Sequence, residues 1–330
     1  MKKVILILPY FGKFPSIFPL FLKTVKCNPE VNFLIITDSN WSYGNIENVR
    51  VLNEGFNEFR ERFTDKLGKK ISLKTPYKLC DFKPTYGYVL QEYIKGYDYW
   101  GHCDCDLIFG NLKTVLSPVL EKEYDKLFAA GHLTLYRNIE DVNQLFYATE
   151  ETRCLFDEVS QSDEIWGYDE DFFGQYNIHD IFLKSGLKVY AEDFSINPAV
   201  SFSKFVLKKY SPETRGFEDV PYQNAQYYWE DGHLFQVYKE QGEIHSVEKA
   251  YMHFQMRNMK FDTQLLNASK FKIVPNRFIA GKTRPCSIEE WEKERKFYFN
   301  YHKVDLLKKR IKNKIKGNGI HVHQHNNTSI

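Results

Sequence analysis

The sequence lacks any long run of apolar residues. Its longest early apolar stretch is Val4 to Leu8, which is about the length of one strand, whereas a helix that crosses a bilayer needs about 20 such residues. The basic start, Met1 to Lys3, resembles that of a signal peptide, but the apolar stretch is too short and no cleavage site of small residues follows. We therefore expect a cytoplasmic protein without a membrane-spanning helix.

A strong charge of either sign is also missing. The 330 residues include 45 Lys and Arg against 43 Asp and Glu, so the formal net charge is only +2. A dedicated nucleic-acid-binding domain usually has a much larger basic excess, and we expect no nucleic-acid partner. With 43% hydrophobic and 16% aromatic residues, the composition favours a folded chain with a sizeable core, in one large domain or two closely packed ones.

Several motifs that would indicate a familiar chemistry are absent. The chain has no glycine-rich phosphate loop, no Gly-x-Gly-x-x-Gly dinucleotide fingerprint and no Cys-x-x-Cys pair. The six cysteines are scattered, which argues against a disulfide framework and favours reduced thiols. Cys103 and Cys105 lie next to His102 but have no second pair at metal spacing, so we expect no zinc site there.

Short apolar segments alternate with segments of helical periodicity through the first half of the chain. We expect strands at 4–8, 33–37, 49–52, 97–103, 126–130, 133–136 and 188–191, and helices at 15–26, 56–67, 85–94 and 170–183. This alternation predicts an α/β fold with a mostly parallel central sheet and helices on both faces. Ligands bind such sheets at the carboxyl ends of the strands, here 9–12, 38–40 and 104–106.

The most informative feature is an acidic pair at the end of an aromatic strand. Asp104 and Asp106 follow the segment 97–103 and are separated by one residue. On extended backbone these two positions face the same side, so both carboxylates can bind one divalent cation while Cys103 and Cys105 face the packing layer. Carboxylate oxygens suit Mg²⁺ or Mn²⁺, which take phosphate oxygens as further ligands, and a diphosphate is therefore the expected partner. Two surface aspartates in a turn are the alternative interpretation.

Several stretches resemble nucleotide-sugar glycosyltransferases of the GT-A fold, and more narrowly an uncharacterised bacterial family associated with capsule and surface-polysaccharide synthesis. They are Leu8-Pro9-Tyr10-Phe11-Gly12, Tyr77-Lys78-Leu79-Cys80-Asp81-Phe82-Lys83-Pro84, the segment 100–112 and His253-Phe254-Gln255. The resemblance implies a GT-A-like, Rossmann-like catalytic domain over 1–260, with a nucleotide-binding half at about 1–112 and a sugar and acceptor half at about 113–260. Residues 261–330 would form a C-terminal helical extension.

The resemblance also implies which residues surround the donor. Those expected to bind the nucleotide sugar are Pro9, Tyr10, Phe11, Gly12, Asp38, Lys78, Asp81, Lys83, Asp104 and His132. Gly12 permits close backbone approach, and Asp38 would accept hydrogen bonds from the base or ribose unless it is only a turn or helix cap. Lys78 or Lys83 would balance the negative charge of the diphosphate, unless it is an ordinary surface lysine. His132 can equally be a packed histidine.

The same resemblance assigns the metal ligands and the catalytic acids. Asp104, Asp106 and His253 would hold Mn²⁺ or Mg²⁺, although a lone histidine in an aromatic strand can also be structural. Asp169 and Glu170 lie beside aromatic residues and are the expected catalytic pair. One of them would deprotonate an acceptor hydroxyl in an inverting enzyme, or bind the donor sugar in a retaining one. The alternative is an acidic helix N-terminus.

Together these inferences predict a metal-dependent hexosyltransferase. It would move a sugar from a nucleotide diphosphate donor, expected to be a UDP-sugar, to a hydroxyl of a lipid-linked surface glycan. A haloacid-dehalogenase-like phosphatase also uses Asp-x-Asp after a strand, but after its opening strand and with Thr or Val where this chain has Ile108. A non-catalytic sugar-binding protein on the same fold is the third interpretation. The acidic motif departs from the commoner Gly-Gly-Ile-Tyr-x-Asp-x-Asp pattern, which leaves the sugar and the stereochemical outcome open.

The C-terminal segment changes character. From 291 to 316 it is rich in Lys and Arg, and Leu307, Ile311 and Ile315 are spaced four apart on one helical face. This pattern is typical of a basic amphipathic helix that contacts anionic lipid, or of an ordinary solvated C-terminal helix. Under the first interpretation, residues 303–316 would hold the protein at the inner face of the plasma membrane.

Overall fold

The fold is that of a computed structural model of the chain. It describes residues 1–150, 152–171, 176–199, 205–220, 224–255, 257, 259–296, 298, 304, 308, 311 and 312. The expected amphipathic stripe lies largely outside these residues, because Leu307 and Ile315 are not among them. None of the helices in the described part of the chain has the length and apolar character that crossing a membrane requires.

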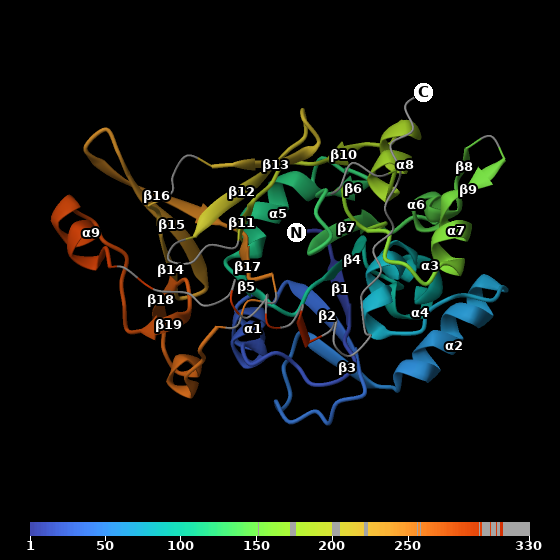
Figure 1. The fold of residues 1–330 in the computed structure, drawn as a ribbon, viewed down its shortest axis with the longest axis horizontal. Coiled ribbons are helices and arrows are strands. Elements are labelled where there is room, and N and C mark those ends of the chain that lie inside the picture. Colours follow the sequence, from blue (N-terminus) through green and yellow to red (C-terminus); the bar gives the residue numbers. More distant parts are fainter. Residues whose placement is uncertain are drawn as a thin grey trace.

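A seven-stranded sheet forms the centre of the molecule (Figure 1). Its strands are Val4–Pro9 (β1), Val31–Thr37 (β2), Val49–Asn53 (β3), Tyr99–Cys103 (β4), Lys126–Leu127 (β6), Leu133–Arg137 (β7) and Val189–Tyr190 (β10). Their spatial order is β10-β6-β7-β4-β1-β2-β3. All adjacent pairs are parallel except the two that involve β7, which runs against β4 and β6. The predicted mostly parallel α/β fold is confirmed.

Helices cover both faces of this sheet because its central strands are apolar on both sides. Alternate residues of a strand point to opposite faces. Leu6 and Phe33 belong to one buried cluster, which includes residues of Phe18–Lys26 (α1) and Leu112–Leu120 (α5). Ile7 and Leu34 belong to a second buried cluster, which includes Phe59 and Phe63 of Phe56–Leu67 (α2). Burial on both faces explains why β1 and β2 have nearly continuous apolar sequences.

The other helices are short. They are the 3₁₀ helices Pro76–Thr85 (η1), Leu145–Tyr147 (η2) and Thr263–Leu266 (η3), and the α-helices Tyr86–Val89 (α3), Gln91–Ile94 (α4), Glu140–Gln144 (α6), Leu155–Gln161 (α7), Ile178–Lys184 (α8) and Ile288–Glu294 (α9). The single helix predicted at 85–94 is wrong, since Leu90 leaves helical geometry (φ −112°, ψ 32°) and separates α3 from α4. The strand predicted at 126–130 is shorter than expected.

The helix predicted at 170–183 begins later than expected. The backbone N–H of Asp171 donates to the carbonyl of Ala129 at 2.9 Å, so this part of the segment pairs with the preceding loop. Asn177 then starts α8 with a capping box in which Asp180 is the reciprocal partner. Aromatic and aliphatic residues at helical spacing therefore did not indicate a helix over the first part of this range.

Two further five-stranded sheets and a small β-ribbon were not predicted. Their orders are β13-β12-β11-β17-β5, β16-β15-β14-β18-β19 and β8-β9. Their strands are Leu107–Phe109 (β5), Thr149–Glu150 (β8), Arg153–Cys154 (β9), Ser195–Ala199 (β11), Val206–Ser211 (β12), Gly216–Asp219 (β13), Gln226–Glu230 (β14), His233–Glu240 (β15), Glu243–Lys249 (β16), Tyr251–His253 (β17), Lys270–Val274 (β18) and Arg277–Ala280 (β19). The segment after residue 260 thus contributes β18 and β19 as well as α9.

A third buried cluster joins the two five-stranded sheets to helix α1, which packs on the central sheet. It includes Leu20 of α1, Ile108 of β5, Met252 of β17 and Trp229 of β14. The indole N–H of Trp229 donates to the carbonyl of Phe109 at 2.9 Å, which ties β14 to β5. The added sheets therefore pack next to the end of β4, close to the acidic pair.

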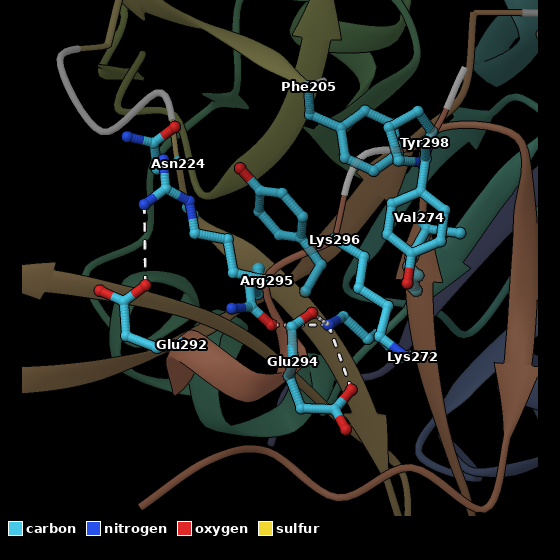
Figure 2. A pocket seen from close by; sticks show the side chains of 14 residues that line it. Phe205, Asn224, Lys272, Val274, Glu292, Glu294, Arg295, Lys296 and Tyr298 are labelled. Carbon is cyan, nitrogen blue, oxygen red and sulfur yellow. Dashed lines mark hydrogen bonds and ion pairs between the residues drawn. The ribbon is translucent and has the colours of Figure 1, made fainter. Parts of the chain in front are cut away.

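A cavity of about 500 Å³ opens on the sheet that contains β14 and β18 (Figure 2). Lys272 in its wall donates to Gln226 Oε1 and to the Glu294 carbonyl, each at 2.6 Å, and Glu292 faces Arg295. None of the residues predicted to form the active site lines this cavity. The candidate site is therefore identified from the geometry of the acidic residues.

Candidate functional site

Strand register brings two histidines to the acidic pair, which lies between β4 and β5. Because β7 is antiparallel to β4, its beginning lies at the edge where β4 ends, and the Asp104 N–H donates to the His132 carbonyl at 3.0 Å. On the other side, β17 pairs antiparallel with β5 and places its last residue, His253, opposite Leu107. Leu107 directly follows Asp106, so His253 reaches the acidic pair.

The side chains of Asp104, Asp106 and His253 converge. A ligand atom from each lies within 4.8 Å of the others. His253 Nε2 is 3.8 Å from Asp104 Oδ2 and 3.5 Å from Asp106 Oδ1. Ligands about 2.1 Å from a six-coordinate ion are separated by about 3 Å when adjacent, so small side-chain movements would complete such a site. The donor set therefore fits a divalent cation, and the binding of a metal ion here stays a prediction.

The cysteines that alternate with these aspartates face the other way. Cys103 and Cys105 are both buried in the cluster that includes α1 and α5. This confirms the predicted packing role of the two thiols. Strand β4 ends at Cys103 and residues 105 and 106 lie in a bend, so the conformation of this loop, and not strand alternation alone, brings the two carboxylates together.

The electrostatics of the site keep its imidazoles neutral. Burial lowers the pKa of His253 to about 4. Burial, and then the nearby His253, lower the pKa of His132 to about 3. Burial opposes ionisation of Asp104, but the charges of Lys83 and His253 outweigh it and hold the pKa of Asp104 below its usual value. Asp104 is therefore ionised at neutral pH while His253 presents a lone pair, which are the forms that bind a metal.

His132 lies directly behind this group. Its ring centre is 4.4 Å from that of His253, and its Nδ1 is 2.9 Å from the hydroxyl of Tyr251. His132 is buried, and its carbonyl is the partner of the Asp104 N–H. These contacts position the candidate metal-binding triad of Asp104, Asp106 and His253, and a direct contact of His132 with the donor stays a prediction.

Asp169 and Glu170 lie on the opposite side of Lys83. Lys83 Nζ is 3.0 Å from Asp169 Oδ2 and 3.0 Å from Asp104 Oδ1, so one ammonium joins the two acidic groups. The N–H of Gly131 donates to Glu170 Oε2 at 3.2 Å. The helix α8 begins only at Ile178, and the alternative that these acids mark a helix N-terminus is therefore wrong.

Burial shifts the ionisation of both acids toward neutral pH. It raises the pKa of Asp169 to about 6. Burial, and then the charge of Asp169, raise the pKa of Glu170 to about 7. A carboxylate that titrates near neutral pH can accept a proton from a substrate hydroxyl more readily than one with an ordinary pKa. The structure thus brings together an acidic pair suited to proton transfer and a separate set of atoms that could bind a metal.

The space around Gly131 is too small for any side chain. A Cβ added there would lie 2.4 Å from Asp169 Oδ2 and 2.9 Å from Asp169 Cγ. We expect Gly131→Ala to fold but to push the Asp169 carboxylate away from Lys83, because the side chain must move and its buried ion pair must break. A reaction that depends on this carboxylate should slow about 10- to 100-fold, since misplacing a reacting group by about 1 Å has effects of this size. Gly186→Ala, at an open surface turn, is the control for a small loss of stability.

The loops after β1 and β2 meet at the same edge of the sheet. Gly12 has a φ of +91°, which only glycine adopts without strain. Its N–H donates to Asp38 Oδ1 at 2.7 Å, and its carbonyl accepts from Ser39 Oγ at 2.5 Å. Asp38 therefore supports the turn, as the alternative interpretation held, and its contact with a nucleotide stays a prediction.

The other residues of the first loop differ in their surroundings. Pro9 ends β1. The Tyr10 hydroxyl donates to the Lys13 carbonyl at 3.3 Å, and burial, followed by the nearby Cys105 and Asp106, raises the pKa of Tyr10 to about 12. The ring of Phe11 instead packs against α2, 5.3 Å from Phe56 and 5.4 Å from Phe59. Tyr10 is thus next to the site, and Phe11 helps to anchor the loop.

Lys78 and Asp81 form a buried ion pair inside η1. Their charged atoms are 2.8 Å apart, and the side chains are 2% and 0% exposed. Asp81 also accepts from the backbone N–H groups of Trp166 and Tyr168, each at 3.0 Å. These contacts hold the segment that ends at Asp169. Contact of Lys78 or Asp81 with a nucleotide stays a prediction.

Sequence reasoning missed Tyr77. This residue is 62% exposed on the 3₁₀ helix that carries Lys83, and its hydroxyl interacts electrostatically with Glu170 and Asp169. An exposed aromatic ring beside carboxylates is a suitable surface for a sugar ring. No periodicity distinguishes Tyr77 from the many core aromatics, so only the tertiary structure identifies it.

Comparison with known proteins identifies the family. Residues 6–282 match the sequence profile of DUF6625, a family of unknown function. The chain belongs to this family. The match covers the central sheet, the acidic pair, both acids of the second pair and His253. No curated protein matches the chain in sequence.

Several solved structures align with part of the chain at low sequence identity. The galactosyltransferase LgtC, crystallised with donor and acceptor sugar analogs, aligns with a TM-score of 0.34 at 12% identity, over 59% of this chain and 76% of that chain. TarS 1–349 of S. aureus aligns with a TM-score of 0.26 at 14% identity, over 47% and 53% of the two chains. The glycosyltransferase GlyE of Streptococcus pneumoniae TIGR4 aligns with a TM-score of 0.30 at 10% identity, over 59% and 46%.

Proposed function

We propose that this protein is a metal-dependent glycosyltransferase that uses a nucleotide diphosphate sugar, with a UDP-sugar as the expected donor. The observation that carries the proposal is the convergence of Asp104, Asp106 and His253 at the edge where the parallel strands end. A second acidic pair, Asp169 and Glu170, lies beside them across Lys83. A cation site next to buried acids of raised pKa matches the needs of sugar transfer from a diphosphate.

Asp104, Asp106 and His253 would hold Mn²⁺ or Mg²⁺. When bound, the ion would supply Lewis acid chemistry that neutralises the charge developing on the departing diphosphate. Two carboxylates with one imidazole favour Mn²⁺ over Mg²⁺, because Mg²⁺ binds oxygen ligands almost exclusively. The loops that contain Gly12 and Asp38 lie at the same edge of the sheet and would receive the nucleoside.

Asp169 and Glu170 would act on the sugar side. Lys83 and Gly131 orient their carboxylates. In an inverting reaction, one of them accepts the proton of the acceptor hydroxyl as that oxygen attacks the anomeric carbon. In a retaining reaction, the acid binds the donor sugar instead. The exposed ring of Tyr77 would provide a stacking surface for a sugar.

The phosphatase interpretation is not favoured. In such enzymes the acidic motif follows the opening strand, whereas here it follows β4, which lies next to the opening strand β1 in the sheet. The acceptor is proposed to be a lipid-linked surface glycan. We also propose that residues 303–316 contact the inner membrane face. Most of these residues lie outside the described part of the chain.

The proposal is tested with a panel of nucleotide sugars and Mn²⁺. We expect one donor both to raise the melting temperature and to release its nucleoside diphosphate in a Mn²⁺-dependent reaction. A ligand present at about 100 times its dissociation constant adds about 2.7 kcal/mol of stability, which a thermal scan detects readily. Stabilisation without release by any donor, with or without glycan acceptors, would indicate a sugar-binding protein. Hydrolysis of p-nitrophenyl phosphate would indicate a phosphatase.

A further inference from the structure

Three protein oxygens surround the Lys83 ammonium, two as hydrogen-bond acceptors and one as an ion-pair partner. An ammonium group has three N–H donors. Lys83 Nζ lies 3.0 Å from Asp104 Oδ1, 3.0 Å from Asp169 Oδ2 and 2.9 Å from the Gly131 carbonyl. Its side chain is only 14% exposed. A diphosphate would therefore have to compete with these protein oxygens for the ammonium.

A metal ion would compete with Lys83 for the carboxylate of Asp104. Asp104 belongs to the candidate metal triad, so its carboxylate is shared between Lys83 and the cation site. A divalent cation on Asp104 repels the ammonium, because both are positive and the site is mostly buried. The attraction of Asp169 and of an incoming diphosphate then draws Lys83 the other way.

We propose that Lys83 is an internal counter-ion that divalent metal binding displaces from Asp104, which frees one of its donors for the diphosphate of the donor sugar. This inference rests on the proposed function and adds the order of events: the metal loads first, and Lys83 becomes available to the substrate as a result. Lys83 also continues to hold Asp169, so the metal-binding residue and the sugar-side acid are linked through one side chain.

The proposal predicts opposite effects on metal affinity and on donor affinity. Removing the ammonium removes a positive charge that competes with the metal for Asp104, so the metal should bind more tightly. It also removes the donor that would be released to the diphosphate, so the nucleotide sugar should bind more weakly. A lysine that merely stabilises the fold, or that only contacts the diphosphate, would not tighten metal binding.

The test compares Lys83→Met with the wild-type protein by titration of Mn²⁺ without nucleotide, using isothermal calorimetry or the electron paramagnetic resonance signal of free Mn²⁺. We expect Mn²⁺ to bind on the order of tenfold more tightly to the variant, the size of a charge interaction over a few ångströms in a partly hydrated site. UDP affinity at saturating Mn²⁺ should fall on the order of tenfold or more. Lys83→Arg keeps the charge and should leave Mn²⁺ affinity within about threefold of wild type.

One control and one replacement variant separate this role from a structural one. Lys78→Met removes another buried lysine of η1, which is paired with Asp81, and should lower the melting temperature without tightening Mn²⁺ binding. Lys83→Gln replaces Lys83→Met if the latter does not fold. Unchanged or weaker Mn²⁺ binding in a folded Lys83 variant would overturn the inference while leaving the proposed function intact. A wild-type protein that binds no Mn²⁺ would instead overturn the proposed function.

Discussion

Replacing Asp106 by asparagine is expected to abolish metal-dependent release of the nucleoside diphosphate. Asp106 Oδ1 lies 3.5 Å from His253 Nε2 in a side chain that is almost wholly buried, and it provides half of the carboxylate charge of the triad. A metal ion contributes several kcal/mol of charge stabilisation in such reactions. Loss of the bound metal ion should therefore lower the rate of UDP release by about 10³-fold or more, measured at saturating donor and Mn²⁺.

The same variant should bind Mn²⁺ poorly but fold normally. Asparagine has the shape of aspartate, and removing one of two neighbouring negative charges relieves repulsion when no metal is bound. The melting temperature without metal should thus equal or exceed that of the wild type, while the stabilisation by Mn²⁺ disappears. Asp65→Asn, on the exposed surface of α2, is the control and should change neither property. Wild-type rates in Asp106→Asn would remove the basis of the metal assignment.

Replacing Asp169 by asparagine should have the second largest effect. The Asp169 carboxylate is buried, forms an ion pair with Lys83 at 3.0 Å, and has a pKa raised to about 6 by burial. An amide cannot accept a proton and offers Lys83 a weaker partner. We expect turnover to fall by about 10²- to 10⁴-fold, the usual contribution of a general acid or base. Mn²⁺ affinity should change far less than in Asp106→Asn.

Product analysis would decide which role Asp169 has. If the product anomer is inverted relative to the donor, loss of turnover in Asp169→Asn with unchanged donor affinity indicates a base. If the anomer is retained, the variant should lose donor affinity as well. The matched control is Asp171→Asn, a second buried carboxylate that pairs with Arg215 at 2.6 Å. It should lower the melting temperature and reduce turnover much less; equal losses in the two variants would argue that Asp169 is only structural.

Local patterns were sufficient for the central sheet and for the acidic pair. The strands β1 and β2 are apolar on both faces, and α2 was predicted with its observed bounds, Phe56–Leu67. Asp104 and Asp106 were identified because a polar pair directly follows a buried strand, which requires no knowledge of distant residues. These features depend on burial and periodicity within a few residues.

The outer sheets could not be predicted in the same way. Glu243–Lys249 (β16) has only two aliphatic residues, Ile244 and Val247, and none of its residues is buried, so it shows no apolar run. It forms a strand because it pairs along its whole length with β15. Strand formation there is decided by hydrogen bonding to a neighbour, and the sequence of one strand does not contain that information.

The arrangement of the site therefore has two origins. The residue types and the sheet edge at which Asp104 and Asp106 lie follow from the order of apolar and acidic residues along the chain. His253 lies beside them only because β17 pairs with β5. Lys83 joins Asp104 to Asp169 only because η1 packs against the loop of residues 129–131. Contacts between segments far apart in the chain depend on register and close packing of the whole core, which no local pattern encodes.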